Sequence, residues 1–234
     1  MSQITVISLD LDNTLWHAEP VLIAAEKAMR DWLMSHAPGV IPGLGRENLL
    51  QHKQHLLAEY PELQHQVSQI RLRLLQNLLD EAGYRDSERD DLARQAFQVF
   101  YNARQKVTLF QPVLSVLETL SQQYQLISIT NGNANPEVIG IAPYFSYAFS
   151  AESEGISKPH ARIFENALAT LSVPAEAVLH VGDHLTDDVA GAAAVGMKTV
   201  WINADLQSSP VQMPVKADAV IRCIGELPAI VASL

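Results

Sequence analysis

The chain has 234 residues, 48% of them hydrophobic, and a formal net charge of −10 at pH 7. This length predicts one core domain with an insertion and argues against two independent domains. The acidic charge argues against a nucleic-acid partner, and a single cysteine excludes an internal disulfide framework. No export leader or membrane-length apolar run is evident, so we expect a cytoplasmic protein without a membrane partner.

Two carboxylates end the first apolar stretch of the chain, ITVISLDLDNTLW at residues 4–16. The apolar run before them is typical of a parallel strand buried on both faces. Side chains alternate along a strand, so Asp10 and Asp12 share one side and need a cation between them. Mg²⁺ meets that need and leaves a carboxylate free to act as nucleophile. The simpler alternative is a strand that ends in solvated turn residues.

The next hundred residues contain no second strand of this kind and are expected to be helical. Amphipathic patterns predict helices from Pro20 to about Ala37 and over residues 47–59, 63–82 and 87–106. We therefore expect residues 16–107 to form a helical cap, inserted into an α/β core made of residues 1–15 and 108–234.

Strands and helices alternate in the rest of the chain. Strands are predicted over residues 125–130, 147–150, 177–181, 198–202 and 217–221, and helices over 112–123, 135–141, 159–171 and 189–195, with a short helix at the end. Such alternation is typical of a doubly wound parallel sheet of the Rossmann-like α/β class.

Polar and charged residues follow three of these strands, and among them Thr130, Asn131 and Lys158 suit phosphate binding. Thr130 and Asn131 end one strand, Lys158 lies at a helix entrance, and Asp183 follows another strand, with Asp187 and Asp188 a few residues later. Each motif alone has an ordinary explanation as a turn, an exposed lysine or a helix N-terminus. The carboxyl ends of parallel strands meet at one edge of the sheet, where ligands bind.

Taken in order, the motifs DLDNTL, TNG, SKP and GDHLTDD resemble those of the haloacid dehalogenase (HAD) superfamily of phosphohydrolases, in the branch with a helical cap after the first motif. The resemblance spans essentially the whole core. It implies that Asp10 attacks phosphorus to form an aspartyl phosphate. Asp12 would protonate the leaving oxygen and then activate water.

The resemblance also implies how phosphate and metal are held. Mg²⁺ would be bound by Asp10, the backbone carbonyl of Asp12, and Asp183. The family's last acid follows four or five residues after Asp183, so both Asp187 and Asp188 qualify, and the alignment of the following helix favours Asp188. Charge on the transferring phosphoryl group would be stabilised by three residues, Thr130, Asn131 and Lys158.

Other activities compete with a phosphatase. Dehalogenases of the superfamily need no metal and lack the second acid of the first motif, so Asp12 together with Asp183 argues for phosphate. A sugar-phosphate mutase, a phospho-acceptor module and a non-catalytic binding protein stay open as alternatives. The core motifs look like the flavin mononucleotide phosphatase branch, although another nucleotide or sugar phosphate would suit them too. Trp16 would either stack on a flat substrate ring or anchor the junction with the cap. The oligomeric state is left open.

Overall fold

The computed structural model describes residues 3–204 and 216–234. The chain divides into two compact units, one made of residues 1–17 and 108–234 and the other of residues 18–107. We call them the core and the cap and describe each by itself. In the described residues, no helix is both long enough and apolar enough to cross a membrane.

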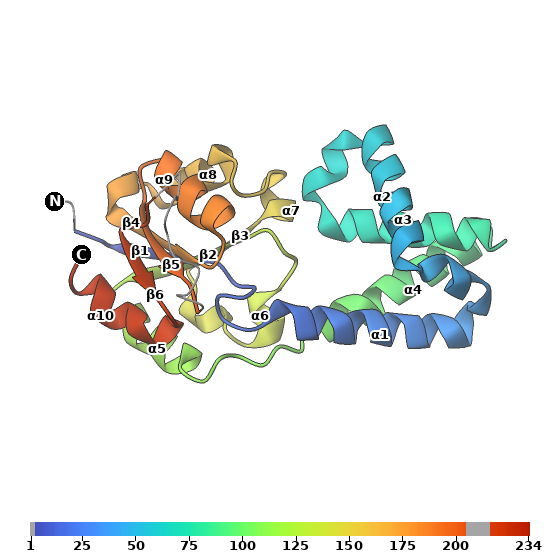
Figure 1. Ribbon diagram of the computed structural model, residues 1–234, viewed down its shortest axis with the longest axis horizontal. Helices are drawn as coiled ribbons and strands as arrows, with labels where there is room; N and C mark the ends of the chain where they lie inside the picture. Colours follow the sequence, from blue (N-terminus) through green and yellow to red (C-terminus); the bar gives the residue numbers. More distant parts are fainter. Residues whose placement is uncertain (1–2, 205–215) are drawn as a thin grey trace. The chain divides into compact units, whose positions relative to one another are not determined.

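The core is built on a parallel sheet with strand order β3-β2-β1-β4-β5-β6 (Figure 1). Its strands in the described residues are β1 (Val6–Leu9), β2 (Gln125–Thr130), β3 (Tyr147–Ser150), β4 (Val178–Gly182), β5 (Lys198–Ile202) and β6 (Ala219–Ile221). All four residues of β1 are buried, as expected for a central strand covered on both faces. The predicted doubly wound α/β fold is confirmed.

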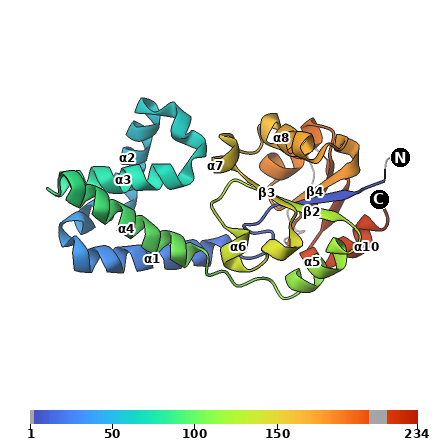
Figure 2. The same ribbon diagram turned by 180° about the vertical axis from the view of Figure 1, so that it is seen from behind.

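Helices cover both faces of this sheet. Figures 1 and 2 show α8 (Ala161–Leu171) and α9 (Gly191–Ala194) on one face, and α5 (Val113–Ser121) and α10 (Leu227–Val231) on the other. The first face buries an apolar cluster that includes Phe164 of α8. Two single-turn helices, α6 (Pro136–Ile139) and α7 (Ala151–Glu154), follow β2 and β3.

The cap consists of helices and follows β1 directly. Its helices are α1 (Ala18–His36), α2 (Arg46–Glu59), α3 (Val67–Glu81) and α4 (Asp86–Arg104), with 3-10 segments at Pro38–Leu44 and Pro61–His65. Its apolar core joins α1, α3 and α4 around the fully buried Leu33 and Leu79. The predicted helical insertion after the first strand is therefore observed.

Two helix boundaries differ from those expected. The first cap helix begins at Ala18, two residues before Pro20. A helix tolerates proline in its first turn, because the N–H that proline lacks would have no hydrogen-bond partner within the helix there. The helix expected over residues 189–195 begins earlier, as a π-helical turn at Leu185–Ala190 that leads into α9. That turn begins two residues after the acid Asp183 and includes Asp187 and Asp188 in its helical backbone.

The first boundary between core and cap also lies two residues later than expected, after His17 and not after Leu15. Trp16 is fully buried and forms bridge pairs with Asp12 and with Leu109, so it clusters with the core. The sequence pattern did not reveal these pairings, because Leu109 lies far away along the chain.

Candidate active site

The strand order places a pocket at the switch point of the sheet. β1 pairs with β2 on one side and with β4 on the other. The chain builds β2 and β3 on the first side and then crosses to β4 on the second, so the strand order reverses next to β1. Ligands bind at such a point, beyond the carboxyl ends of the strands. A pocket of about 190 Å³ lies there, lined only by core residues: Asp10, Asp12, Asn13, Thr130, Asn131, Gly132, Lys158, Asp183, His184, Asp187 and Asp188. The motifs that the sequence singled out thus come together in one place.

Lys158 links two of the acids and is 97% buried, with a relative exposure of 3%. Its Nζ donates hydrogen bonds to Asp10 Oδ1 at 2.7 Å, to Asp188 Oδ1 at 2.5 Å and to the carbonyl oxygen of Ile129 at 2.8 Å. These three bonds satisfy all three ammonium protons. Burial lowers the pKa of Lys158, but the two carboxylates outweigh it and hold the pKa above its usual value. The exposed-lysine reading is therefore wrong.

Asp10 is a buried carboxylate in a crowded electrostatic environment. Burial raises its pKa to about 7, and the charges of Asp188 and Asp183 act in the same direction, against Lys158. The Thr14 hydroxyl donates to Asp10 Oδ2 at 3.2 Å. With Lys158 on the other oxygen, the carboxylate is held in one orientation. A carboxylate destabilised by burial gains from any cation that binds it.

Asp12 lies in the tight turn after β1. Asn13 adopts a positive φ of 62°, which asparagine tolerates better than most residues, and its N–H donates to the carbonyl oxygen of Trp16 at 2.8 Å. The Trp16 indole N–H donates to Asp12 Oδ1 at 2.9 Å. The Trp16 ring is fully buried and orients Asp12, so this structure does not present it for stacking on a substrate.

Thr130 and Asn131 also line the core pocket. The Thr130 hydroxyl accepts a hydrogen bond from the Gly132 N–H at 3.1 Å. Asn131 Oδ1 accepts from the backbone N–H of Lys158 at 2.8 Å, and its Nδ2 donates to the Lys158 carbonyl oxygen at 3.0 Å. Nδ2 also approaches Asp187 Oδ2 at 3.3 Å. Asn131 therefore fixes the loop that delivers Lys158.

The geometry distinguishes Asp187 from Asp188. Asp188 is almost fully buried, bonds Lys158, and accepts from the backbone N–H of His184 at 2.9 Å. Burial raises the pKa of Asp188, but Lys158 and His180 together outweigh that effect and the net shift is downward. Asp187 is more exposed and its Oδ2 accepts from Asn131. Of these two acids, only Asp188 forms a hydrogen bond with Lys158.

Gly182 makes room for this arrangement at the end of β4. A Cβ atom added there would lie 2.2 Å from Cγ of Asp188, a distance that no side chain tolerates. Asp183 follows directly, and burial, reinforced by the charge of Asp188, raises its pKa. Glycine at this position thus lets two acids of one motif approach the same strand end.

His180 is a buried polar residue that the sequence reasoning missed. It lies on β4 next to Ser8 of β1, and its Nδ1 is 2.9 Å from the Ser8 hydroxyl. Its Nε2 is 3.2 Å from Asp188 Oδ1. Burial lowers the pKa of His180, so the neutral ring with its proton on Nε2 satisfies both contacts. The only signal in the sequence was a histidine inside an otherwise apolar strand.

Three carboxylates could hold a metal ion. One oxygen from each of Asp10, Asp183 and Asp188 lies within 4.8 Å of the others. Hard oxygen donors and the raised pKa values of Asp10 and Asp183 suit a divalent cation such as Mg²⁺. The Asp12 side chain is not part of this cluster. The residues present thus fit the cofactor that the sequence predicts.

Comparison with known proteins identifies the family. Residues 4–196 match the haloacid dehalogenase-like hydrolases, and the chain belongs to this family. The 5-amino-6-(5-phospho-D-ribitylamino)uracil phosphatase YigB of Escherichia coli K12 is 32% identical over 212 residues, 89% of each chain. A glyceraldehyde 3-phosphate phosphatase of Pyrococcus abyssi is 41% identical over 83 residues, 33% of this chain and 35% of that one. The protein is a HAD-family phosphatase, a phosphoric monoester hydrolase that acts on small phosphorylated metabolites.

Solved structures share the whole fold. One described as a 2-haloacid dehalogenase from Pseudomonas syringae pv. Tomato DC3000 has a TM-score of 0.94 and 39% identity, with 99% of both chains covered. The HAD-hydrolase YfnB of Bacillus subtilis, bound to magnesium, has a TM-score of 0.66 and 22% identity over 98% of this chain and 99% of that one. The second likeness concerns the fold alone.

Proposed function

We propose that the protein hydrolyses its substrate in two steps through an aspartyl phosphate on Asp10. The observation that supports this most is the buried Asp10 carboxylate, oriented by Lys158 and Thr14 at the switch point of the sheet. In the first step an Asp10 oxygen attacks phosphorus, the bond from phosphorus to the ester oxygen breaks, and Asp12 gives that oxygen a proton. In the second step Asp12 takes a proton from water, which attacks phosphorus and releases phosphate and Asp10.

The other pocket residues position the phosphoryl group and stabilise its charge. Lys158 offers a fixed positive charge, and Thr130 and Asn131 offer polar groups in the same pocket. Mg²⁺, held by Asp10, Asp183 and the backbone carbonyl of Asp12, would neutralise negative charge when bound. Asp188 fixes Lys158 and so acts on the reaction indirectly.

For the substrate, we propose a ribityl phosphate attached to a nitrogen heterocycle. The name of the Escherichia coli relative describes such a compound, and flavin mononucleotide, which the core motifs suggest, is another. The core pocket of about 190 Å³ is smaller than the roughly 300–1,000 Å³ of sites that enclose a drug-sized ligand. It suits the phosphate end of such a molecule and leaves the heterocycle to other parts of the protein. Other nucleotide or sugar phosphates are the alternatives.

The name of the Pseudomonas syringae structure favours a second candidate, hydrolytic dehalogenation of a 2-haloacid. In that reaction Asp10 would attack carbon and displace halide, with no leaving oxygen to protonate. The Asp12 carboxylate, oriented by the Trp16 indole, would then have no proton to deliver. This arrangement favours the phosphatase.

A single assay set separates these activities. Phosphate release is measured with Mg²⁺ for flavin mononucleotide, the ribitylaminouracil phosphate and glyceraldehyde 3-phosphate, and halide release is measured for 2-chloropropionate. We expect phosphate release that stops when a chelator is added, fastest with a ribityl phosphate. Halide release without phosphate release would contradict the phosphatase mechanism. An isomeric phosphate in place of free phosphate would indicate a mutase, and a stable phosphoprotein without turnover would indicate a phospho-acceptor.

A further inference from the structure

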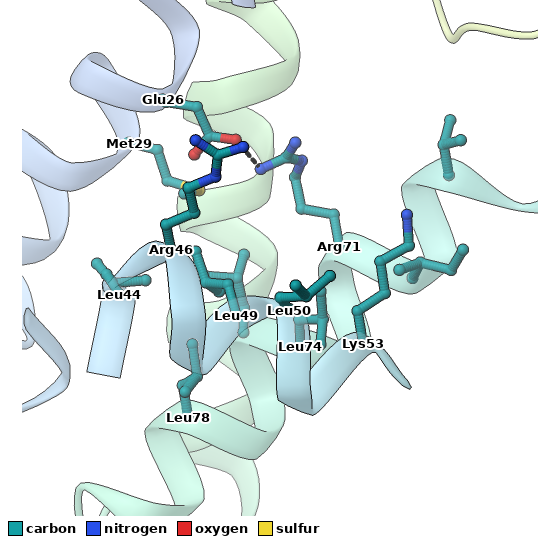
Figure 3. A pocket seen from close by; sticks show the side chains of 13 residues that line it. Glu26, Met29, Leu44, Arg46, Leu49, Leu50, Lys53, Arg71, Leu74 and Leu78 are labelled. Atoms are coloured by element: carbon teal, nitrogen blue, oxygen red, sulfur yellow. Dashed lines mark hydrogen bonds and ion pairs between the residues drawn. The ribbon is translucent and has the colours of Figure 1, made fainter. Parts of the chain in front are cut away.

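The cap contains a second pocket, which is larger than the core pocket and shares no residue with it. It has a volume of about 430 Å³ and is lined only by cap residues (Figure 3): Glu26, Met29, Leu44, Arg46, Leu49, Leu50, Lys53, Val67, Ile70, Arg71, Leu74, Leu75 and Leu78. We call it the cap pocket. Its volume lies within the roughly 300–1,000 Å³ range of sites that enclose a small organic molecule.

Apolar side chains form the floor of the cap pocket and stay partly uncovered, because α2 packs loosely. Of the 14 residues of α2, only Leu56 is buried, whereas α3 buries four residues. Leu49 and Leu50 of α2 face the pocket, and Leu50 keeps 55% of its surface exposed. Val67 at the start of α3 is 38% exposed. Exposed apolar side chains that cluster around a pocket are typical of a surface that binds a ligand or a partner.

The rim of the cap pocket is basic. Figure 3 shows Arg46 of α2 and Arg71 of α3 extending toward Glu26, whereas Lys53 of α2 extends away from Glu26 at another part of the pocket. Three cations and one carboxylate thus line the pocket, in a chain whose net charge is −10. A basic rim on an acidic protein is a local feature that attracts anions.

One of these cations is already paired. Arg71 Nη1 is 2.5 Å from Glu26 Oε1, and the Arg71 guanidinium lies 3.6 Å from the centre of the Phe100 ring. Among the residues that the structure describes, no carboxylate lies within ion-pair distance of Arg46 or Lys53. The net charge offered to a ligand is therefore positive and comes from α2.

From this combination we infer that the cap pocket binds an organic anion with an apolar body, such as an aromatic ring system or a medium-length acyl chain that bears one acidic group. The leucine floor takes the apolar body and Arg46 and Lys53 take the charge. Burial of apolar ligand surface supplies most of the affinity. The charge pairs at the rim select an anion over a neutral molecule.

The test uses two fluorescent probes that differ by one charged group, 8-anilinonaphthalene-1-sulfonate and the neutral N-phenyl-1-naphthylamine. Titrations are done with the full chain carrying D10N, so that turnover plays no part and failure of the proposed phosphatase would leave the result unaffected. We expect the sulfonate to bind more tightly than the neutral probe. The double variant R46E/K53E should weaken sulfonate binding at least about 10-fold and leave the neutral probe within about twofold.

Two further variants make this test specific. L50Q removes an exposed apolar contact from the floor without disturbing the buried core, and should weaken both probes. R94E is a charge-reversal control that changes the net charge half as much as R46E/K53E, because it reverses one exposed arginine of α4 that does not line the pocket. Circular dichroism and thermal unfolding establish that each variant is folded, since loosely packed states also bind the sulfonate.

Several outcomes would overturn the inference. Sulfonate binding that is unchanged in R46E/K53E, or weakened equally by R94E, would remove the cap pocket as the site. Displacement of the probe by Mg²⁺ with inorganic phosphate would place it in the core pocket instead. Self-association that blocks probe binding as protein concentration rises would mean that a second copy covers the cap pocket.

Discussion

The two pockets of this protein are built on opposite physical principles. The core pocket joins buried charges that satisfy one another: Asp10, Lys158 and Asp188 form one hydrogen-bonded chain, and all three are at most 6% exposed. The cap pocket has an apolar floor, and its one ion pair, Arg71 with Glu26, has side chains 28% and 45% exposed. The contrast suits a core that acts on a small charged group and a cap pocket that takes an organic anion with an apolar body.

The magnitudes support this contrast. Each ion of a buried pair loses several kcal/mol of hydration free energy when it leaves water. Such a pair is therefore often no more stabilising than apolar side chains of the same size. A chain of three such groups in the core is therefore poor evidence for stability and better evidence for a reaction. A half-exposed pair such as Arg71 with Glu26 contributes only about 0–1 kcal/mol, and it serves to hold the rim in place.

The largest expected effect is that of D10N on turnover. The amide keeps the shape of the side chain and loses the attacking charge, so phosphate release should fall by at least about 10⁴-fold. Cap-pocket probe binding should stay as in the wild type, which separates the two regions. Near wild-type turnover, with the folded state checked by circular dichroism, would remove Asp10 as the nucleophile.

The late acids should differ in their effect on Mg²⁺ affinity. D183N should weaken the affinity most, D188N about 10- to 100-fold, and D187N least. In the proposed site Asp183 binds the ion directly, whereas protein donors occupy both oxygens of Asp188 and leave it an indirect effect. Asp187 bonds Asn131 and does not touch Lys158. Isothermal titration with Mg²⁺ measures the order. A larger effect for D187N than for D188N would show that the wrong acid had been assigned.

His180 should act as a positioning residue for Asp188. H180L removes the Nε2 hydrogen bond to Asp188 and should lower kcat about 10- to 100-fold, since a hydrogen bond to a charged group contributes about 1.5–3 kcal/mol. H180Q keeps a donor near that place and should recover much of the loss, whereas KM changes little in either variant. Equal losses for H180L and H180Q, in step with lower melting temperatures, would indicate a purely structural role.

Trp16 offers a smaller and more selective effect. W16F keeps most of the buried ring and loses the N–H that donates to Asp12, so leaving-group protonation should suffer and kcat should fall about 10-fold. Substrates with acidic leaving groups, such as aryl phosphates, should be affected less than alkyl phosphates. An equal loss for both classes would mean that the indole does not act through Asp12.

The smallest expected effect on the core is that of L79A in the cap. Leu79 is fully buried in the cap core, and its truncation should cost about 2–5 kcal/mol of cap stability. Mg²⁺ affinity, a property of the core pocket, should stay unchanged, and probe binding to the cap pocket should fall. Chemical denaturation followed together with Mg²⁺ titration tests this. A parallel loss of Mg²⁺ affinity would contradict the separation of the two pockets.

The sequence by itself determined the parallel α/β fold, the helical insertion and the family. These follow from local patterns, namely apolar runs that end in acids and helical periodicity over residues 16–107. Motif order along the chain also predicted that Asp10, Thr130, Lys158 and Asp183 would meet, because parallel strands end at one edge. The same reasoning predicted Asp10 and Asp183 as metal ligands, but the third carboxylate of the cluster is Asp188 and not the side chain of Asp12.

Only the tertiary structure decided the contacts between side chains that are distant in sequence or hidden in apolar segments. Ser8 and His180 meet because β1 and β4 are paired in a register that neither strand specifies alone. The burial of Lys158 and its bond to Asp188 depend on how a loop and a π-helical turn approach one strand end. The cap pocket exists because α2 packs loosely against α3. Helical periodicity shows which face of a helix is apolar, but only packing shows whether that face is covered.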